Sequence, residues 1–197
     1  EFSPMTAKLL VEIAEEAGLP PGVLNVVNGF GEDAGRALTE HPAIKAIAFV
    51  GESRTGSMIM AQGAATLKRV HFELGGKNPG IVFADCDLAK AIEGSLRSVF
   101  ANCGQVCLGT ERMYVQRPIF DEFVSRLKDG AEALRLGRPE DPATNLRPLV
   151  SETHRQKVLS YFRLAVDEGA TVVCGGGVPD MEDDLSAGSW VQPTIWT

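Results

Sequence analysis

The sequence predicts an α/β protein made of two consecutive units, each with parallel strands covered by helices. Short apolar runs alternate with longer segments of helical periodicity, which is the order of elements in a parallel sheet. Glycine and proline stand at many of the junctions between them. The alternation stops at Gly75-Gly76 and then starts again. We therefore place a boundary there, between units 1–75 and 76–197.

The first unit is expected to open with a helix. Ser3 is a favourable N-cap, Pro4 suits the first helical position, and Gly18 ends the helix. Its apolar residues are expected to form one buried stripe: Leu9, Leu10, Ile13, Ala14 and Ala17. The elements expected after it are a strand over 23–27, a helix over 33–40, a strand over 46–50, a helix entered through 51–53 and a strand over 70–74.

The second unit repeats this order. Its expected elements are a strand over 81–83, a helix capped by Asp85 or Asp87 that reaches Phe100, a strand over 112–116, a helix opened by Pro118, a helix from Ser151 to Gly169 and a strand over 171–173. The residues of the last helix expected to point inward are Val158, Leu159, Phe162, Ala165 and Val166. The acidic segment 179–188 is expected to be a surface loop.

The composition excludes several classes of protein. A net charge of −7 leaves no basic surface for a nucleic acid. No apolar run approaches the roughly 20 residues of a membrane span. Four cysteines are too few for a disulfide framework, which favours a reducing, cytoplasmic compartment. Both ends read as interrupted elements, so we expect a piece of a longer protein, with a processed short protein as the alternative.

Two glycine-rich turns at strand-to-helix junctions are candidates for binding a dinucleotide. The first, residues 29–35, has the spacing GxGxxxG. A turn that only needs positive φ would use the same glycines. The second, residues 51–56, would offer the free N–H groups of a helix N-terminus to a pyrophosphate. Its alternative is a plain helix cap, and Glu52 would repel a phosphate there.

Cys107 and Glu73 are the candidate catalytic residues. Cys107 lies in Asn-Cys-Gly-Gln-Val-Cys, where Gly104 and Gly109 leave backbone room for a substrate. A nucleophilic cysteine acts as its thiolate and needs solvent access, so we expect Cys107 off any apolar face. Its alternative is a buried structural cysteine. Glu73 precedes Leu74-Gly75-Gly76-Lys77 and could be a base, or only a solvated carboxylate.

A metal site is not expected. Cys103 and Cys107 have the spacing CxxxC, but no second pair of ligands follows them. The three histidines, His41, His71 and His154, lie far from these cysteines in the sequence. We also expect His71 to face away from the neighbours of Glu73, which leaves histidine-assisted thiol catalysis without support.

The segments around Glu73 and Cys107, in this order, resemble the two signatures of NAD(P)-dependent aldehyde dehydrogenases. The chain is similar to that superfamily from Glu1 to Thr197. Residues 100–112, 175–179 and 190–196 carry a closer resemblance to the 2-hydroxymuconic semialdehyde dehydrogenases of aromatic meta-cleavage pathways. The resemblance implies a Rossmann-like parallel sheet segment that ends an NAD-binding domain over 1–75. It also implies the start of an α/β catalytic domain over 76–197, so that the aldehyde dehydrogenase-like fold is incomplete.

By this resemblance Cys107 is the nucleophile and Glu73 the general base. The thiolate would attack the aldehyde, a hydride would pass to NAD, and water activated by Glu73 would hydrolyse the thioester. The cofactor contacts would fall on Glu1, Gly31, Gly35, Phe49, Gly51, Ser53, Gly56 and Leu74. Glu1 indicates NAD rather than NADP, because a carboxylate accepts the ribose 2′-OH and repels a 2′-phosphate.

The sequence departs from the family in three ways. Glu52 stands where relatives often have serine, and Val50 where threonine is common, which leaves Ser53 or backbone N–H groups for the pyrophosphate. The family's oxyanion asparagine, its ribose-binding lysine and its Glu-Ile-Phe-Gly-Pro motif are expected outside residues 1–197. The chain by itself is therefore expected to be inactive.

The implied partner is a small aldehyde, and the implied full-length protein is a homodimer or homotetramer. Two alternatives stay open. A CoA-acylating aldehyde dehydrogenase would pass the thioester to a thiol, and Glu73 argues against it because those relatives usually lack the base. A non-catalytic protein on the same fold is the other, because a fold does not guarantee a function.

Overall fold

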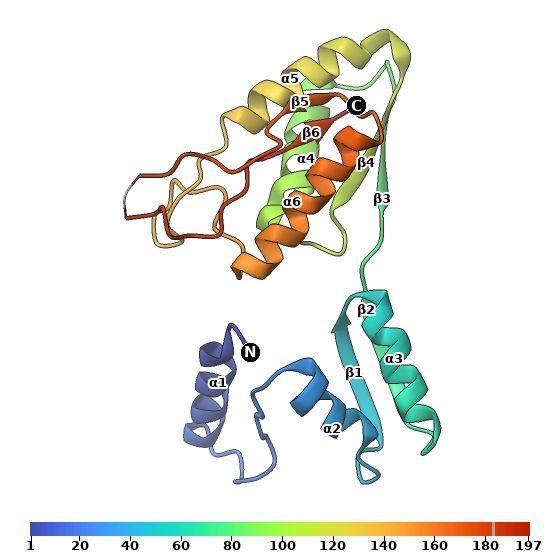
Figure 1. Cartoon of the computed structure of the whole chain (residues 1–197), viewed down its shortest axis with the longest axis vertical. Coiled ribbons are helices and arrows are strands. Elements are labelled where there is room, and N and C mark those ends of the chain that lie inside the picture. The colour runs from blue at the N-terminus through green and yellow to red at the C-terminus, as the bar shows by residue number, and fades with distance from the viewer. Residues whose placement is uncertain (183) are drawn as a thin grey trace. The chain divides into compact units, whose positions relative to one another are not determined.

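Helices and strands alternate along the chain in the computed structural model, which describes residues 1–182 and 184–197 (Figure 1). The chain divides into two units, Glu1–Gly75 and Gly76–Thr197. Each unit contains a pair of parallel strands joined by a helix, so the predicted α/β class with parallel strands is confirmed. No helix in the described part is both long enough and apolar enough to cross a membrane.

The sheet of the first unit consists of β1, Ala46–Gly51, and β2, Arg69–Leu74, with α3, Ser53–Ala64, between them in the chain. The strands pair in parallel register up to Gly51 and Leu74. Figure 1 shows α3 lying along this pair. Gly56 on α3 is buried, and a methyl group there would lie 3.1 Å from Leu74 Cδ2. The glycine thus lets the start of α3 approach the carboxyl end of β2.

The amino-terminal half of this unit corrects two expectations. The helix α1, Pro4–Glu16, forms as expected, but its apolar stripe is uncovered, with Leu10 56% and Ile13 52% exposed. An apolar stripe is buried only where another surface covers it, and the described unit provides none. The strand expected over 23–27 does not form. A strand needs a hydrogen-bonded neighbour, and the backbone N–H of Val23 instead donates to Pro20 in a turn.

The helix expected over 33–40 begins earlier, because a π-helical turn, η1, Gly31–Gly35, leads into α2, Arg36–Glu40.

The sheet of the second unit consists of β3, Asn78–Val82, and β4, Thr110–Val115, again in parallel. The connection is α4, Leu88–Phe100, followed by the turn η2, Ala101–Gly104. Of the two candidate caps, Asp87 takes the position, and its carboxylate accepts the backbone N–H of Lys90 at 3.2 Å. After η3, Arg117–Ile119, the helix α5, Phe120–Glu132, packs beside α4 (Figure 1).

The core of this unit lies between these helices and the sheet. Two clusters of buried side chains make it up: Val82, Ile92, Phe123 and Leu127 in the first, and Phe100, Ala131, Leu146 and Cys174 in the second. Because Phe100 is the last residue of α4, the second cluster anchors the point where the chain enters the cysteine loop.

The carboxyl-terminal part contains a strand pair of which the sequence analysis expected one member, the strand over 171–173. The helix α6, Glu152–Asp167, is capped by Ser151 as expected and followed by Gly169 with a φ of 92°. The next strand, β5, Val172–Cys174, pairs antiparallel with β6, Ile195–Trp196. Four of the expected inward residues of α6 are half-buried, but Val166 is 54% exposed. Of the expected loop 179–188, the described residues form no helix or strand, and Asp183 lies outside them.

Candidate active site

Cys107 lies in the loop between α4 and β4 and is exposed to solvent. Upstream of it, three consecutive residues have left-handed backbone: Asn102 at φ 50°, Cys103 at φ 57° and Gly104 at φ 73°. A left-handed conformation costs a non-glycine residue roughly 1–2 kcal/mol. Such strain persists where surrounding contacts fix the backbone, and it concentrates at functional sites. The expectation that Cys107 stands off an apolar face agrees with this placement.

The two cysteines of this loop have different surroundings. Cys103 is half-buried, and its thiol donates to the backbone carbonyl of Arg147 at 3.2 Å. Cys107 is the more exposed of the two. Cys103 is therefore held by the main chain of a distant segment, while the thiol of Cys107 faces solvent where a substrate can reach it.

The backbone after Cys107 is fixed by short-range and long-range contacts. The N–H of Gly109 donates to the carbonyl of Val106 at 2.8 Å. Gly109 is buried, and a methyl group there would lie 3.0 Å from Val106 O and 3.2 Å from Ser98 O. The side-chain amide of Asn78, at the start of β3, donates to the carbonyls of Cys107 and Gly109 at 2.7 and 3.0 Å. The loop is thus bound to the sheet on both sides of Leu108.

Sequence analysis missed Asn78 and the charged group beside it. The side chain of Lys77 forms an ion pair with Glu111. The backbone carbonyl of Lys77 accepts hydrogen bonds from Nε and Nη2 of Arg112, at 3.1 and 2.7 Å. One signal was available: a polar residue at the start of a strand that pairs with the strand after the cysteine loop. Without the register of that pair, it did not stand out.

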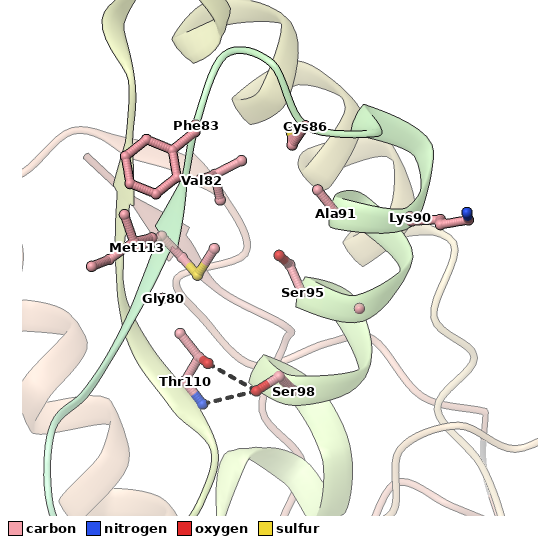
Figure 2. Close-up of a pocket in the computed structure, with 12 residues that line it drawn as sticks. Gly80, Val82, Phe83, Cys86, Lys90, Ala91, Ser95, Ser98, Thr110 and Met113 are labelled. Carbon is pink, nitrogen blue, oxygen red and sulfur yellow. Dashed lines mark hydrogen bonds between the residues drawn. The ribbon is translucent and has the colours of Figure 1, made fainter.

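An open cavity of about 310 Å³ lies between β3, α4 and β4 (Figure 2). Ser98 and Thr110 close one end of it. Their hydroxyls lie 2.8 Å apart, and the backbone N–H of Thr110 donates to the Ser98 hydroxyl at 3.2 Å. Cys107 does not line this cavity. The cavity is therefore not the place where the thiol would meet a substrate.

Glu73 stands on β2 in the first unit, with its side chain exposed. His71 Nε2 lies 3.4 Å from Glu73 Oε1. As expected, His71 faces away from Phe72 and Leu74, the neighbours of Glu73, and it shares the face of Glu73 because residues two apart on a strand point to the same side. The candidate base therefore has an imidazole neighbour on its own strand.

The expected pyrophosphate-binding residues come together around the start of α3. Gly51 ends β1, Ser53 begins α3, and Leu74 is the register partner of Gly51. A methyl group at Gly51 would lie 2.5 Å from Cζ of Phe49, whose ring also meets Phe72 edge-on. The ring of Phe49 thus covers the position that a side chain at residue 51 would take, and Glu52 stands at the N-cap of this helix.

The remaining expected cofactor residues lie in the amino-terminal half of the same unit. Gly31 and Gly35 bound the π-helical turn before α2. Glu1 is exposed, and its neighbour Phe2 packs edge-on against Phe30 with ring centroids 6.5 Å apart. This aromatic contact, absent from the sequence analysis, brings the chain next to Glu1 close to the chain next to Gly31. No described contact joins Glu1 to the start of α3.

A metal centre finds no support within residues 1–182 and 184–197, where no group of three or more His, Cys, Asp or Glu side chains is placed to hold an ion.

Comparison with known proteins gives matches over the entire chain. The model of the aldehyde dehydrogenase family matches residues 1–197. The chain is 66% identical over 198 residues to the 2-hydroxymuconic semialdehyde dehydrogenase of Pseudomonas sp. (strain CF600), which covers 100% of this chain and 41% of that protein. It is 52% identical over 196 residues to a 2-aminomuconic 6-semialdehyde dehydrogenase of Pseudomonas sp., covering 99% and 40% respectively.

A solved structure shares the fold. Betaine aldehyde dehydrogenase from Staphylococcus aureus, crystallised with NAD+, matches with a TM-score of 0.94 at 36% identity, over 98% of this chain and 38% of that one. The chain thus spans about two fifths of the length of the relatives it matches.

Proposed function

The chain belongs to the aldehyde dehydrogenase family, and on that basis we propose that the protein containing it oxidises a semialdehyde to the acid with NAD, through a thioester on Cys107. The observation that carries this proposal is the exposed Cys107 thiol in a strained, glycine-bounded loop held by Asn78. A nucleophile needs access and a fixed backbone, and this loop provides both.

In the proposed reaction the Cys107 thiolate attacks the aldehyde carbon and forms a carbon–sulfur bond. NAD, when bound, accepts the hydride that leaves this carbon, so the aldehyde is oxidised by two electrons to a thioester. Glu73 then takes a proton from water as the water attacks the thioester carbonyl. The carbon–sulfur bond breaks, the acid leaves, and the thiolate is restored.

The cofactor site is proposed on the first unit, as the end of an NAD-binding domain. The feature that supports it is the amino end of α3, because a helix N-terminus offers free N–H groups and a positive dipole to a pyrophosphate. We place the pyrophosphate near Gly51, Ser53 and Gly56, and the nicotinamide near Leu74. The residues placed on the adenosine side are Glu1, Gly31, Gly35 and Phe49. The second unit is proposed as the start of the catalytic domain.

The proposed substrate is of the 2-hydroxymuconic semialdehyde type, as in catabolism of aromatic compounds. The sequence identity is 66% to the 2-hydroxymuconic semialdehyde dehydrogenase and 52% to the 2-aminomuconic 6-semialdehyde dehydrogenase, which supports the 2-hydroxymuconic substrate. We further propose that the full-length protein is a homodimer or homotetramer. We also propose that it is cytoplasmic, which is supported by the free thiols of four cysteines: Cys86, Cys103, Cys107 and Cys174.

The experiment is an assay of NADH formation by the full-length protein. With 2-hydroxymuconic semialdehyde we expect steady turnover, a lower kcat/KM with 2-aminomuconic 6-semialdehyde, and no requirement for CoA. Turnover only in the presence of CoA would establish the acylating alternative. Cofactor binding without turnover of any aldehyde would establish the non-catalytic one.

The same assay applies to the 197-residue chain. We expect it to be inactive by itself, because the family's oxyanion asparagine is expected outside residues 1–197. Loss of one oxyanion donor already slows such reactions about 10²–10³-fold.

A further inference from the structure

Asn78 is joined to the loop that contains Cys107 by its side chain rather than by the backbone hydrogen bonds between β3 and β4. β3 and β4 pair from Asn78↔Thr110, but the register shifts between Asn78 and Pro79. Proline has no N–H to donate, so the ladder is interrupted at the position next to the loop. The Asn78 amide instead donates to the carbonyls of Cys107 and Gly109 at 2.7 and 3.0 Å. An amide nitrogen carries two donors, and both are used here.

Asn78 is itself fixed by its neighbours on the sheet. The carbonyl of Lys77 accepts two hydrogen bonds from Arg112, and the Lys77 ammonium pairs with Glu111. On the opposite side of the loop, Ser98 of α4 holds Thr110, as Figure 2 shows. The Asn78 amide therefore starts from a fixed backbone, and the segment 107–109 is bracketed between a strand and a helix.

We propose that Asn78 is a positioning residue for acylation, which sets the backbone of Cys107 so that its N–H can meet the developing oxyanion; this inference rests on the proposed function. An oxyanion donor must lie about 2.7–3.1 Å from the position that the negative charge will occupy. The chain just before Cys107 holds two strained residues, Asn102 and Cys103, and would relax if the loop were released. The two Asn78 hydrogen bonds oppose that relaxation at the reacting residue.

The test uses the full-length protein with Asn78→Asp, which keeps the shape of the side chain but replaces both donors with an acceptor. The matched control is Asn145→Asp. Asn145 uses its side-chain oxygen, which accepts the backbone N–H of Arg135 at 2.8 Å, and aspartate keeps that acceptor. Asn78→Ala is the second variant, because it removes the donors without adding charge.

Three quantities are measured: the single-turnover rate of acylation by the aldehyde, the affinity for NAD, and the rate of alkylation of Cys107 by iodoacetamide. Alkylation needs an accessible thiolate but no oxyanion donor. We expect both Asn78 variants to lose about 10²-fold in acylation, the loss typical of one oxyanion donor. NAD affinity is expected to stay unchanged in both variants and the alkylation rate to stay unchanged in Asn78→Ala, whereas the added carboxylate in Asn78→Asp disfavours the nearby thiolate and slows alkylation. Asn145→Asp is expected to behave like the unmodified protein in all three.

Acylation at the unmodified rate in both Asn78 variants would overturn the inference. So would a parallel loss of acylation, alkylation and NAD binding in Asn78→Ala, because that pattern describes a merely structural residue. Failure of the proposed function is separable, since it would show as absent aldehyde oxidation in the unmodified protein.

Discussion

Nε2 of His71 lies 3.4 Å from Oε1 of Glu73, and the two side chains project from the same face of β2. Both are exposed, so the pair contributes little to stability, at most about 1 kcal/mol for a surface ion pair. Its significance is chemical. The imidazole lies within reach of the carboxylate that is proposed to activate water.

Replacing His71 with glutamine should therefore change the rate of deacylation and leave acylation unchanged, because the imidazole lies beside the carboxylate that is proposed to activate water. Rapid-mixing measurement of NADH formation and of thioester hydrolysis checks this. Unchanged rates for both steps would contradict it.

The variant Glu73→Gln should slow deacylation far more than acylation. General-base catalysis typically contributes roughly 10²–10⁴-fold, and an amide cannot take the proton. The expected signature is a rapid burst of NADH followed by slow turnover, with the thioester accumulating on Cys107. Mass spectrometry of the quenched protein detects that adduct. Turnover equal to that of the unmodified enzyme would remove Glu73 from the mechanism.

Cys107→Ser should abolish aldehyde oxidation and leave NAD binding intact, because the hydroxyl is a much weaker nucleophile than a thiolate. Cys103→Ser is the matched control from the same loop. Its hydroxyl can still donate to the carbonyl of Arg147, so activity should stay near that of the unmodified protein. Comparable losses in the two variants would show that the exposed thiol has no special role.

Replacing Glu1 with alanine in the full-length protein should relax the preference for NAD. A carboxylate beside the adenosine ribose repels a 2′-phosphate, and a methyl group does not. The ratio of kcat/KM for NAD to that for NADP is the measurement. An unmodified enzyme that used both cofactors equally would already refute the assignment.

Cys174 should make the protein less stable in alkaline solution. Burial raises the pKa of its thiol above the ordinary value. Because the native state then favours the neutral thiol, its stabilising effect is complete below the unfolded pKa of about 8.5 and is lost as the pH rises through the native value. The denaturant midpoint should therefore fall less between neutral and alkaline pH in Cys174→Ala than in the unmodified protein. Equal falls would contradict this reading.

Local signals in the sequence predicted much of the fold, because caps and glycine stops act within one turn. Asp87 and Ser151 begin their helices, and a left-handed Gly169 follows the last one. The failures are long-range. The expected strand over 23–27 finds no partner, and the pairing of β6 with β5 depends on residues about twenty positions apart. Neither outcome can be read from a short window, since a strand exists only with its neighbour.

In the candidate site too, the residues with a local sequence signature were predicted, and the residue whose contacts are long-range was missed. Cys107 and Glu73 carry recognisable local sequence, and their placement in a loop and on a strand followed from it. Asn78 has no such signature, because its role depends on a register shift next to Pro79. The position of His71 beside Glu73 could be predicted from the sequence, since the alternation of side chains along a strand places residues two apart on one face.

The crowding around Gly109 has a consequence for changing the specificity of the proposed enzyme by mutagenesis. A methyl group there would meet the carbonyls of Val106 and Ser98, whereas the adjacent Leu108 is 82% exposed. Substitutions should therefore lower the yield of folded protein at position 109 and be tolerated at position 108. Leu108 is thus the position next to the proposed nucleophile at which the aldehyde specificity of the proposed enzyme can be varied.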